Sequence, residues 1–103
     1  MKISFDFDRT LERYRIKNLA INLYWSGNEI WIHTNRPNKN ILDENINYDI
    51  EQVAKDCLIP DCRIVYCEEE KWKYLQDFDI HFNDNQKEVN EINYYTNCKA
   101  ILI

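Results

Sequence analysis

The chain has 103 residues and a mass of 12.6 kDa, which is the size of one domain. Hydrophobic residues make up 45% of it and charged residues 30%. This balance excludes a disordered tail, a collagen-like chain and a membrane span. The net charge of −5 argues against bulk binding of nucleic acid. We therefore expect residues 1–103 to form a single globular domain with no membrane partner.

The cysteines and the single glycine limit the kinds of binding site and the cellular compartment that we expect. The four cysteines, Cys57, Cys62, Cys67 and Cys98, lack the paired spacing of a structural zinc site. Acidic residues interrupt the N-terminal segment too early for a signal peptide, so we expect reduced thiols and a cytoplasmic location, in the host cytoplasm if the chain is viral. Gly27 is the only glycine, which excludes a glycine-rich phosphate loop.

The first elements alternate between strand and helix patterns. Residues 2–6 predict a short strand that ends in acid. Residues 12–25 carry apolar side chains at helical spacing, and Gly27 follows where a left-handed cap is favoured. Residues 29–33 predict a second strand, and a polar loop then extends to about residue 47.

The middle of the chain continues this alternation. Asp49, with Gln52 three residues later, resembles a capping box that opens a second helix. Residues 62–66 and 79–82 predict two further strands, and a helical turn is expected between them at Lys71–Leu75.

The last elements complete the pattern. Asn85 and Glu88 form a second candidate capping box, and residues 99–103 predict a fifth strand. Strands that alternate with helices pair in parallel through right-handed crossovers. We therefore predict an α/β three-layer sandwich that is Rossmann-like, with a mostly parallel five-stranded sheet.

Polar residues gather where these strands end. In such a sheet a site lies beyond the carboxyl ends of the strands. Asp6 and Asp8 follow the first strand, Thr34 ends the second, and Asp84 ends the fourth. Lys71 precedes the fourth strand. We expect these side chains to meet at one edge of the sheet.

This set suits phosphoryl transfer. Asp6 would attack phosphorus and become an aspartyl phosphate, while Asp8 would protonate the leaving oxygen and later activate water. Thr34 and Lys71 would hold phosphate oxygens. Asp6 and Asp84 would share Mg²⁺, a hard cation that prefers oxygen ligands.

The motifs resemble those of the haloacid dehalogenase-like (HAD) phosphohydrolases. Their first motif, Asp-x-Asp-x-Thr after a hydrophobic strand, is matched by Asp6-Phe7-Asp8-Arg9-Thr10. Their second, a Thr or Ser after the next strand, is matched by Thr34. For their lysine, Lys71 is the better candidate and Lys73 the weaker. Their fourth motif, an acidic pair that ends a strand, resembles Asp79–Asn85.

The resemblance implies a HAD core with Asp6 and Asp8 as catalytic residues. It implies a metal held by Asp6, the main-chain carbonyl of Asp8, Asn83 and Asp84. Asn83 stands where the family usually has a carboxylate and brings no charge, so we expect weaker metal binding. Few residues separate Thr10 from the first helix, which leaves no room for the family's flap or for a cap domain. An uncapped site implies a macromolecular phosphorylated substrate or a lid supplied by a protein partner.

Two hypotheses of function therefore follow, with a third behind them. The first is a Mg²⁺-dependent phosphatase that acts through an aspartyl phosphate. The second is a catalytically weak or inactive HAD-like protein, such as a phage or mobile-element effector that binds a host protein or a phosphorylated ligand. A receiver-like signalling domain is the third, but its acceptor position at the end of the third strand holds Tyr66-Cys67.

Overall fold

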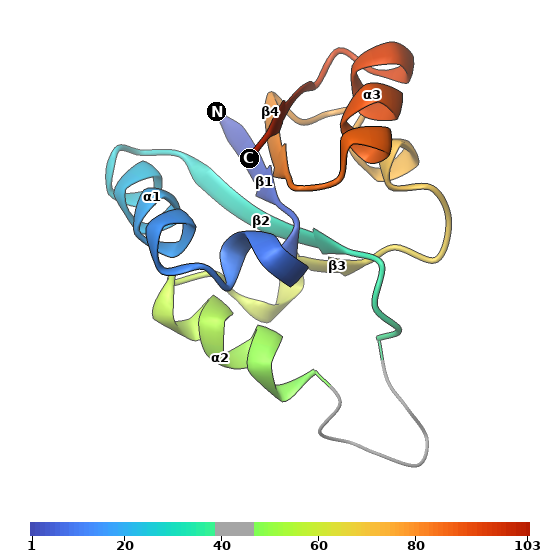
Figure 1. Ribbon diagram of the computed structural model, residues 1–103. Coiled ribbons are helices and arrows are strands. Elements are labelled where there is room, and N and C mark those ends of the chain that lie inside the picture. The colour runs from blue at the N-terminus through green and yellow to red at the C-terminus, as the bar shows by residue number, and fades with distance from the viewer. Residues whose placement is uncertain (39–46) are drawn as a thin grey trace.

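The computed structural model describes residues 1–38 and 47–103. Five strands form one sheet in the order β3-β2-β1-β4-β5, and every neighbouring pair in it is parallel (Figure 1). The strands are β1 (Lys2–Phe5), β2 (Glu29–Thr34), β3 (Ile64–Tyr66), β4 (Ile80–Asn83) and β5 (Lys99–Leu102). The order reverses between β1 and β4, where ligands of such sheets bind.

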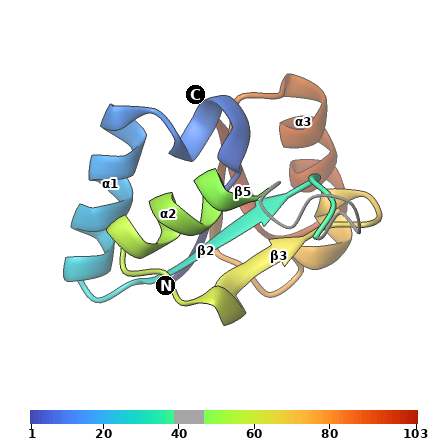
Figure 2. The same ribbon diagram turned by 90° about the horizontal axis from the view of Figure 1, so that it is seen from below.

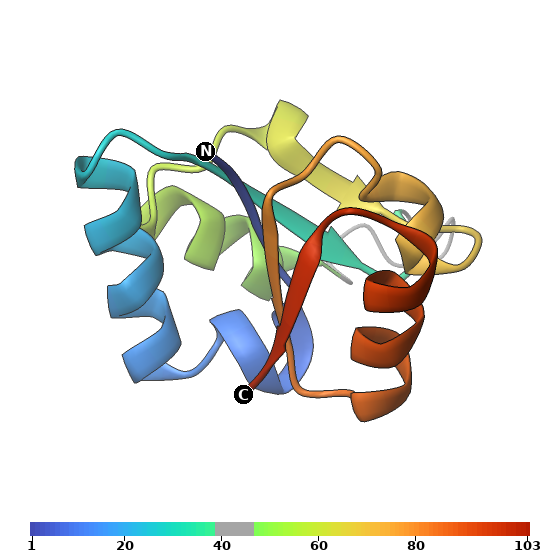
Figure 3. The ribbon, with the colours of Figure 1, turned by 90° about the horizontal axis from the view of Figure 1, so that it is seen from above.

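Helices cover both faces of this sheet. The helices are α1 (Tyr14–Trp25), α2 (Tyr48–Asp56) and α3 (Gln86–Tyr95), and the short turns are η1 (Phe7–Leu11), η2 (Asp61–Arg63) and η3 (Lys71–Tyr74). Figures 2 and 3 show α1 and α2 on one side of the sheet and α3 on the other. The α/β three-layer sandwich predicted from the sequence is therefore confirmed.

The alternation of side chains along β1 divides the interior into two cores. Ile3 and Phe5 pack into the cluster that contains Ala20 of α1 and Ile50 of α2. Ser4 faces the opposite side, where α3 and η3 pack. Strands buried on both faces are usually apolar throughout. The buried Ser4 in the central strand is therefore an exception, and its hydroxyl needs a buried hydrogen-bond partner.

The local expectations were mostly accurate. Gly27 has φ 93°, as the left-handed cap requires. Residues 62–66 form less strand than expected, because η2 takes up the first of them and only Ile64–Tyr66 pairs with β2. The polar loop expected up to residue 47 lies partly outside the described residues. No helix of the described part is long and apolar enough to cross a membrane.

One capping box is confirmed in its N-cap half only, and the other is wrong. The Asn85 side chain accepts a hydrogen bond from the Glu88 N–H at 3.1 Å, as predicted. In α2, however, the cap position is Asn47, and Asp49 lies within the first turn. Its carboxylate accepts a bond from the Ile50 N–H and pairs with Arg36. Asp49 therefore pairs with Arg36 from within the first turn of α2 and does not occupy the cap position.

Candidate functional site

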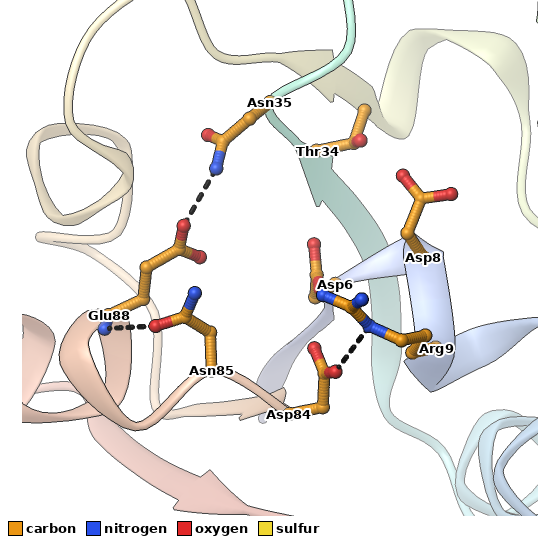
Figure 4. Close-up of a pocket in the computed structure, with 8 residues that line it drawn as sticks. All are labelled: Asp6, Asp8, Arg9, Thr34, Asn35, Asp84, Asn85 and Glu88. Carbon is orange, nitrogen blue, oxygen red and sulfur yellow. Dashed lines mark hydrogen bonds and ion pairs between the residues drawn. The ribbon is translucent and has the colours of Figure 1, made fainter.

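The carboxyl ends of three adjacent strands surround one small cavity. Asp6 follows β1, Thr34 ends β2 and Asp84 follows β4. They help line a depression of about 180 Å³ (Figure 4). Its lining residues are Asp6, Asp8, Arg9, Thr34, Asn35, Asp84, Asn85 and Glu88. The structure thus brings four of the six predicted site residues, Asp6, Asp8, Thr34 and Asp84, to the lining of one cavity.

The turn η1 places both aspartates of the first motif. After β1 the chain makes a wide helical turn, in which the Leu11 N–H donates to the Asp6 carbonyl at 3.2 Å. Inside it Asp8 is extended and Arg9 is left-handed with φ 57°. The Arg9 N–H is held by Oε1 of Glu12 at 2.6 Å. Asp6 and Asp8 consequently both reach the cavity, although they stand two positions apart.

A buried lysine holds Asp6. The Nζ of Lys71 lies 2.7 Å from Oδ1 of Asp6 and 3.0 Å from Oε1 of Glu88, and its side chain is 1% exposed. Burial raises the pKa of Asp6, and Lys71 offsets this only in part. Burial alone would lower the pKa of Lys71, but the two carboxylates outweigh it and raise that pKa. Lys73, the weaker candidate, is more exposed and pairs with nearby glutamates.

Glu88 belongs to this site, although its spacing from Asn85 predicts only a capping role. Its carboxylate lies on the cavity wall and accepts bonds from Asn35 at 2.7 Å and Asn83 at 2.8 Å. Burial would raise the pKa of Glu88, but Lys71 and these amides together lower it. Its place in the first turn of α3, four residues after Asp84, was the signal that could have identified it.

Asn83 lies behind the cavity rather than on its wall. It is fully buried, and its Oδ1 accepts a bond from the Asn85 N–H at 3.0 Å. Its Nδ2 donates to Glu88 and faces Nε2 of His81 at 3.2 Å. The metal-ligand role predicted for Asn83 stays a prediction, and the geometry gives its amide a different set of partners.

Asp8 is held by an arginine from the loop after β2. Nε of Arg36 lies 3.0 Å from Oδ2 of Asp8, and Nη2 lies 2.5 Å from Oδ1. The same guanidinium binds Asp49 of α2 at 2.7 Å. Hydrogen bonds to the carboxylates of Asp8 and Asp49 raise the pKa of Arg36 above its ordinary value. The Arg36 N–H also reaches Oγ1 of Thr34, at 3.3 Å.

Asp84 is held more loosely. Its Oδ2 lies 2.9 Å from Nε of Arg9, whose side chain is 75% exposed (Figure 4). Such an ion pair is weak, because water screens it and the arginine loses rotational freedom. Asp84 is therefore the site carboxylate that most readily exchanges its partner.

The donor chemistry of this wall fits Mg²⁺. Mg²⁺ usually keeps several waters and takes one or two protein carboxylates, and Asp6 and Asp84 supply two at neighbouring strand ends. No cluster of three or more His, Cys, Asp or Glu residues that could hold a metal occurs within residues 1–38 and 47–103.

No protein-family model matches this sequence, and comparison with curated proteins finds no significant match. The parallel sheet with strand order β3-β2-β1-β4-β5 assigns the chain to the Rossmann-like α/β architecture. Because one architecture supports many chemistries, function must be argued from the cavity itself.

Proposed function

We propose that this chain is a Mg²⁺-dependent phosphohydrolase in which Asp6 carries the phosphoryl group. The observation that supports it is the Asp6 carboxylate, which faces the cavity beyond β1 and is backed by the buried ammonium of Lys71 at 2.7 Å. A carboxylate in this position is open to an incoming phosphate, while the cation behind it compensates the charge that gathers during attack.

In the first step an oxygen of Asp6 forms a bond to phosphorus and the bond to the leaving oxygen breaks. Asp8, which lines the same cavity, would first turn away from Arg36 and take up a proton from solvent, and it would then give that proton to the leaving oxygen. Thr34 lies across the cavity, where its hydroxyl would contact a phosphate oxygen.

In the second step water releases the phosphate. Asp8 accepts a proton from a water molecule whose oxygen bonds to phosphorus, and the bond from phosphorus to Asp6 breaks. Bound Mg²⁺, held by Asp6, Asp84 and the main-chain carbonyl of Asp8, would neutralise the phosphate against the anionic nucleophile. Asp6 returns to its starting carboxylate, so the cycle closes on inorganic phosphate.

The cavity is small and open, which favours a phosphate group presented on a larger molecule. Its volume of about 180 Å³ is below the roughly 300–1,000 Å³ of pockets that enclose a whole small-molecule ligand. We therefore propose a phosphorylated substrate, macromolecular ones included.

Three of the four cysteines are buried and none forms a disulfide, which agrees with a cytoplasmic setting.

A second candidate function is capture without turnover, of a phosphorylated ligand or of a protein partner. The pair between Arg36 and Asp8 favours it, because the group that should protonate the leaving oxygen is bound to a cation. A phage or mobile-element effector would act in this way.

The test compares hydrolysis of a broad phosphate-ester panel with Mg²⁺ by the wild type and three variants. Asp6→Asn should abolish turnover, because an amide forms no aspartyl phosphate. Asp8→Asn should reduce kcat on the order of 10²–10⁴-fold. Thr34→Ala should mainly raise KM. Beryllium fluoride with Mg²⁺ should form an adduct on Asp6.

The two candidates give different outcomes. A wild type that hydrolyses nothing and forms no beryllium fluoride adduct contradicts the phosphatase proposal. If the Asp6→Asn/Asp8→Asn double variant then keeps the biological effect, capture of a protein partner is supported. Circular dichroism should show all variants folded, because these side chains stand at strand ends.

A further inference from the structure

A chain of buried polar residues runs through the core from the sheet to the site. Ser4, His33, His81 and Asn83 lie at 0 to 1% exposure on the face of the sheet that α3 and η3 cover. The Ser4 Oγ lies 2.7 Å from Nδ1 of His33 and 2.9 Å from Nδ1 of His81. His81 Nε2 faces Asn83, which binds Glu88. We name these four residues the buried relay.

The partners of Asn83 determine its orientation. Its Oδ1 faces the Asn85 N–H, and its Nδ2 faces the Glu88 carboxylate. A rotated amide would set oxygen against carboxylate and N–H against N–H. The Asn83 NH₂ group therefore has one hydrogen for Glu88 and one for His81.

This orientation determines the protonation of the histidines. Because Asn83 donates to Nε2 of His81, that nitrogen is bare and the proton lies on Nδ1, which donates to Ser4. The Ser4 hydroxyl then donates to Nδ1 of His33. Because Nδ1 of His33 accepts this bond, the proton of His33 lies on Nε2, toward the backbone of Tyr74. Each hydrogen bond in the relay has one donor and one acceptor.

The relay ends on the ion pair of the site. Asn83 and Lys71 bind the same oxygen of Glu88, Oε1, at 2.8 and 3.0 Å. Lys71 in turn contacts Asp6 at 2.7 Å. The place of the Glu88 oxygen therefore sets where the ammonium sits between its two carboxylates.

We propose that His81 and Asn83 are positioning residues, which fix the Glu88 carboxylate and through it the contact between Lys71 and Asp6. The effect of this positioning on turnover rests on the function proposed above. The proposal explains why position 83 holds an amide. Aspartate there would set two carboxylates against each other and leave His81 Nε2 without a donor.

Reversing the donor–acceptor direction of the hydrogen bonds in the relay would not compensate for an aspartate at position 83. His81 would have to move its proton to Nε2, and Ser4 would then donate to His81 and leave His33 Nδ1 unpaired. Moving the His33 proton to Nδ1 would instead set a bare nitrogen against the backbone of Tyr74. An unpaired buried polar group costs about 1–3 kcal/mol, so the relay has one favoured direction.

The first test is the tautomeric state of the two histidines in the full chain. They are the only histidines of the sequence, so correlation spectra of ring ¹⁵N nuclei contain two spin systems. We expect His81 with its proton on Nδ1 and His33 with its proton on Nε2. A proton on Nε2 of His81 would overturn the proposal without any variant.

The second test uses Asn83→Asp, with Asn93→Asp as the matched control. Asn93, which is more exposed than Asn83, also uses both amide atoms, on the backbone of Ala100 in β5, so Asn93→Asp replaces an amide by a carboxylate away from the relay. Asn83→Asp should move the His81 proton to Nε2 and reduce kcat about 10–100-fold with KM nearly unchanged. The control should change neither. A shifted tautomer with unchanged kcat would overturn the positioning role.

Two further measurements separate this proposal from a structural role and from the proposed function. His81→Gln keeps an acceptor toward Asn83 and should retain kcat, whereas His81→Leu should not; equal losses would contradict positioning. If the wild type hydrolyses no phosphate ester, the phosphatase proposal fails alone. The ¹⁵Nζ signal of Lys71 then decides, since Asn83→Asp should shift it and Asn93→Asp should not. An unmoved signal would overturn the relay.

Discussion

Lys71 sits 2.7 Å from Asp6 and 3.0 Å from Glu88, so one buried cation serves two carboxylates. Three charges are thus removed from water with only one of positive sign among them. The arrangement is held by hydrogen bonds to Glu88, whereas Asp6 keeps an open side toward the cavity. The same Asp6 carboxylate therefore affects both the stability of the fold and the reactivity of the site. The first prediction concerns its effect on stability.

Asp6→Asn should stabilise the protein at pH 7. An acid whose pKa is raised in the folded chain binds its proton more tightly when folded, so its presence lowers stability as pH rises above 3.8. An asparagine still accepts the Lys71 bond but carries no charge to desolvate. We expect the melting temperature of the variant to exceed that of the wild type at pH 7, and the difference to shrink at pH 3.

Asp77→Asn is the control for this prediction. It removes the same charge from an exposed position, so it should show a smaller gain. If Asp6→Asn melts below the wild type at pH 7, Asp6 is a structural acceptor and the balance of charges argued here is wrong.

Lys71→Met should have the opposite effect on stability. It leaves Asp6 and Glu88 facing each other without a cation, and breaking a buried pair costs about 3–5 kcal/mol. Urea unfolding at pH 7 measures the loss, which should diminish in acid as the carboxylates take up protons. Lys73→Met, two residues away, removes only ion pairs that water screens and should cost far less. Similar losses would contradict the special role of Lys71.

The buried histidines should make the protein sensitive to mild acid. Burial, with the charges of Lys71 and Lys2, lowers the pKa of His33 to about 3, and burial lowers the pKa of His81 as well. Unfolding lets both rings take up protons below about pH 6.5, so stability is full above that pH and falls as pH decreases. Each histidine contributes about 1.4 kcal/mol per pH unit.

Urea unfolding between pH 6.5 and 5 measures this slope. His33→Gln should reduce the slope, whatever its effect on stability at pH 7, because one of the two titrating rings is gone. A slope that is the same in both proteins would show that His33 is not buried in neutral form.

The sequence predicted which strand ends would meet, but not how the side chains would pair. Asp6, Thr34 and Asp84 converge because the carboxyl ends of neighbouring parallel strands share one edge. Such patterns depend on local periodicity, which the sheet preserves.

Pairings between distant segments could not be predicted in this way. Arg36 reaches Asp8 across 28 positions, and the direction of a side chain in a loop has no signal in spacing. Glu88 was taken for half of a capping box, and its backbone N–H does bind Asn85. Its carboxylate pairs instead with Lys71, because the buried ammonium is a stronger hydrogen-bond partner for a carboxylate than a helix N–H is.

The last prediction concerns how Asp84 chooses between a protein cation and a metal ion. Its partner Arg9 is 75% exposed and must leave if Mg²⁺ binds between Asp6 and Asp84. Arg9→Gln removes this competitor, so Mg²⁺ should bind a few-fold more tightly by calorimetry, consistent with the small energy of exposed pairs. Arg13→Gln makes the same change of net charge at an exposed position nearby and should have a smaller effect. Asp84→Asn should weaken Mg²⁺ binding and reduce the rise in melting temperature that Mg²⁺ causes through linkage. If Arg9→Gln and Arg13→Gln alter the affinity equally, only long-range charge is at work, and Asp84 does not exchange Arg9 for the metal.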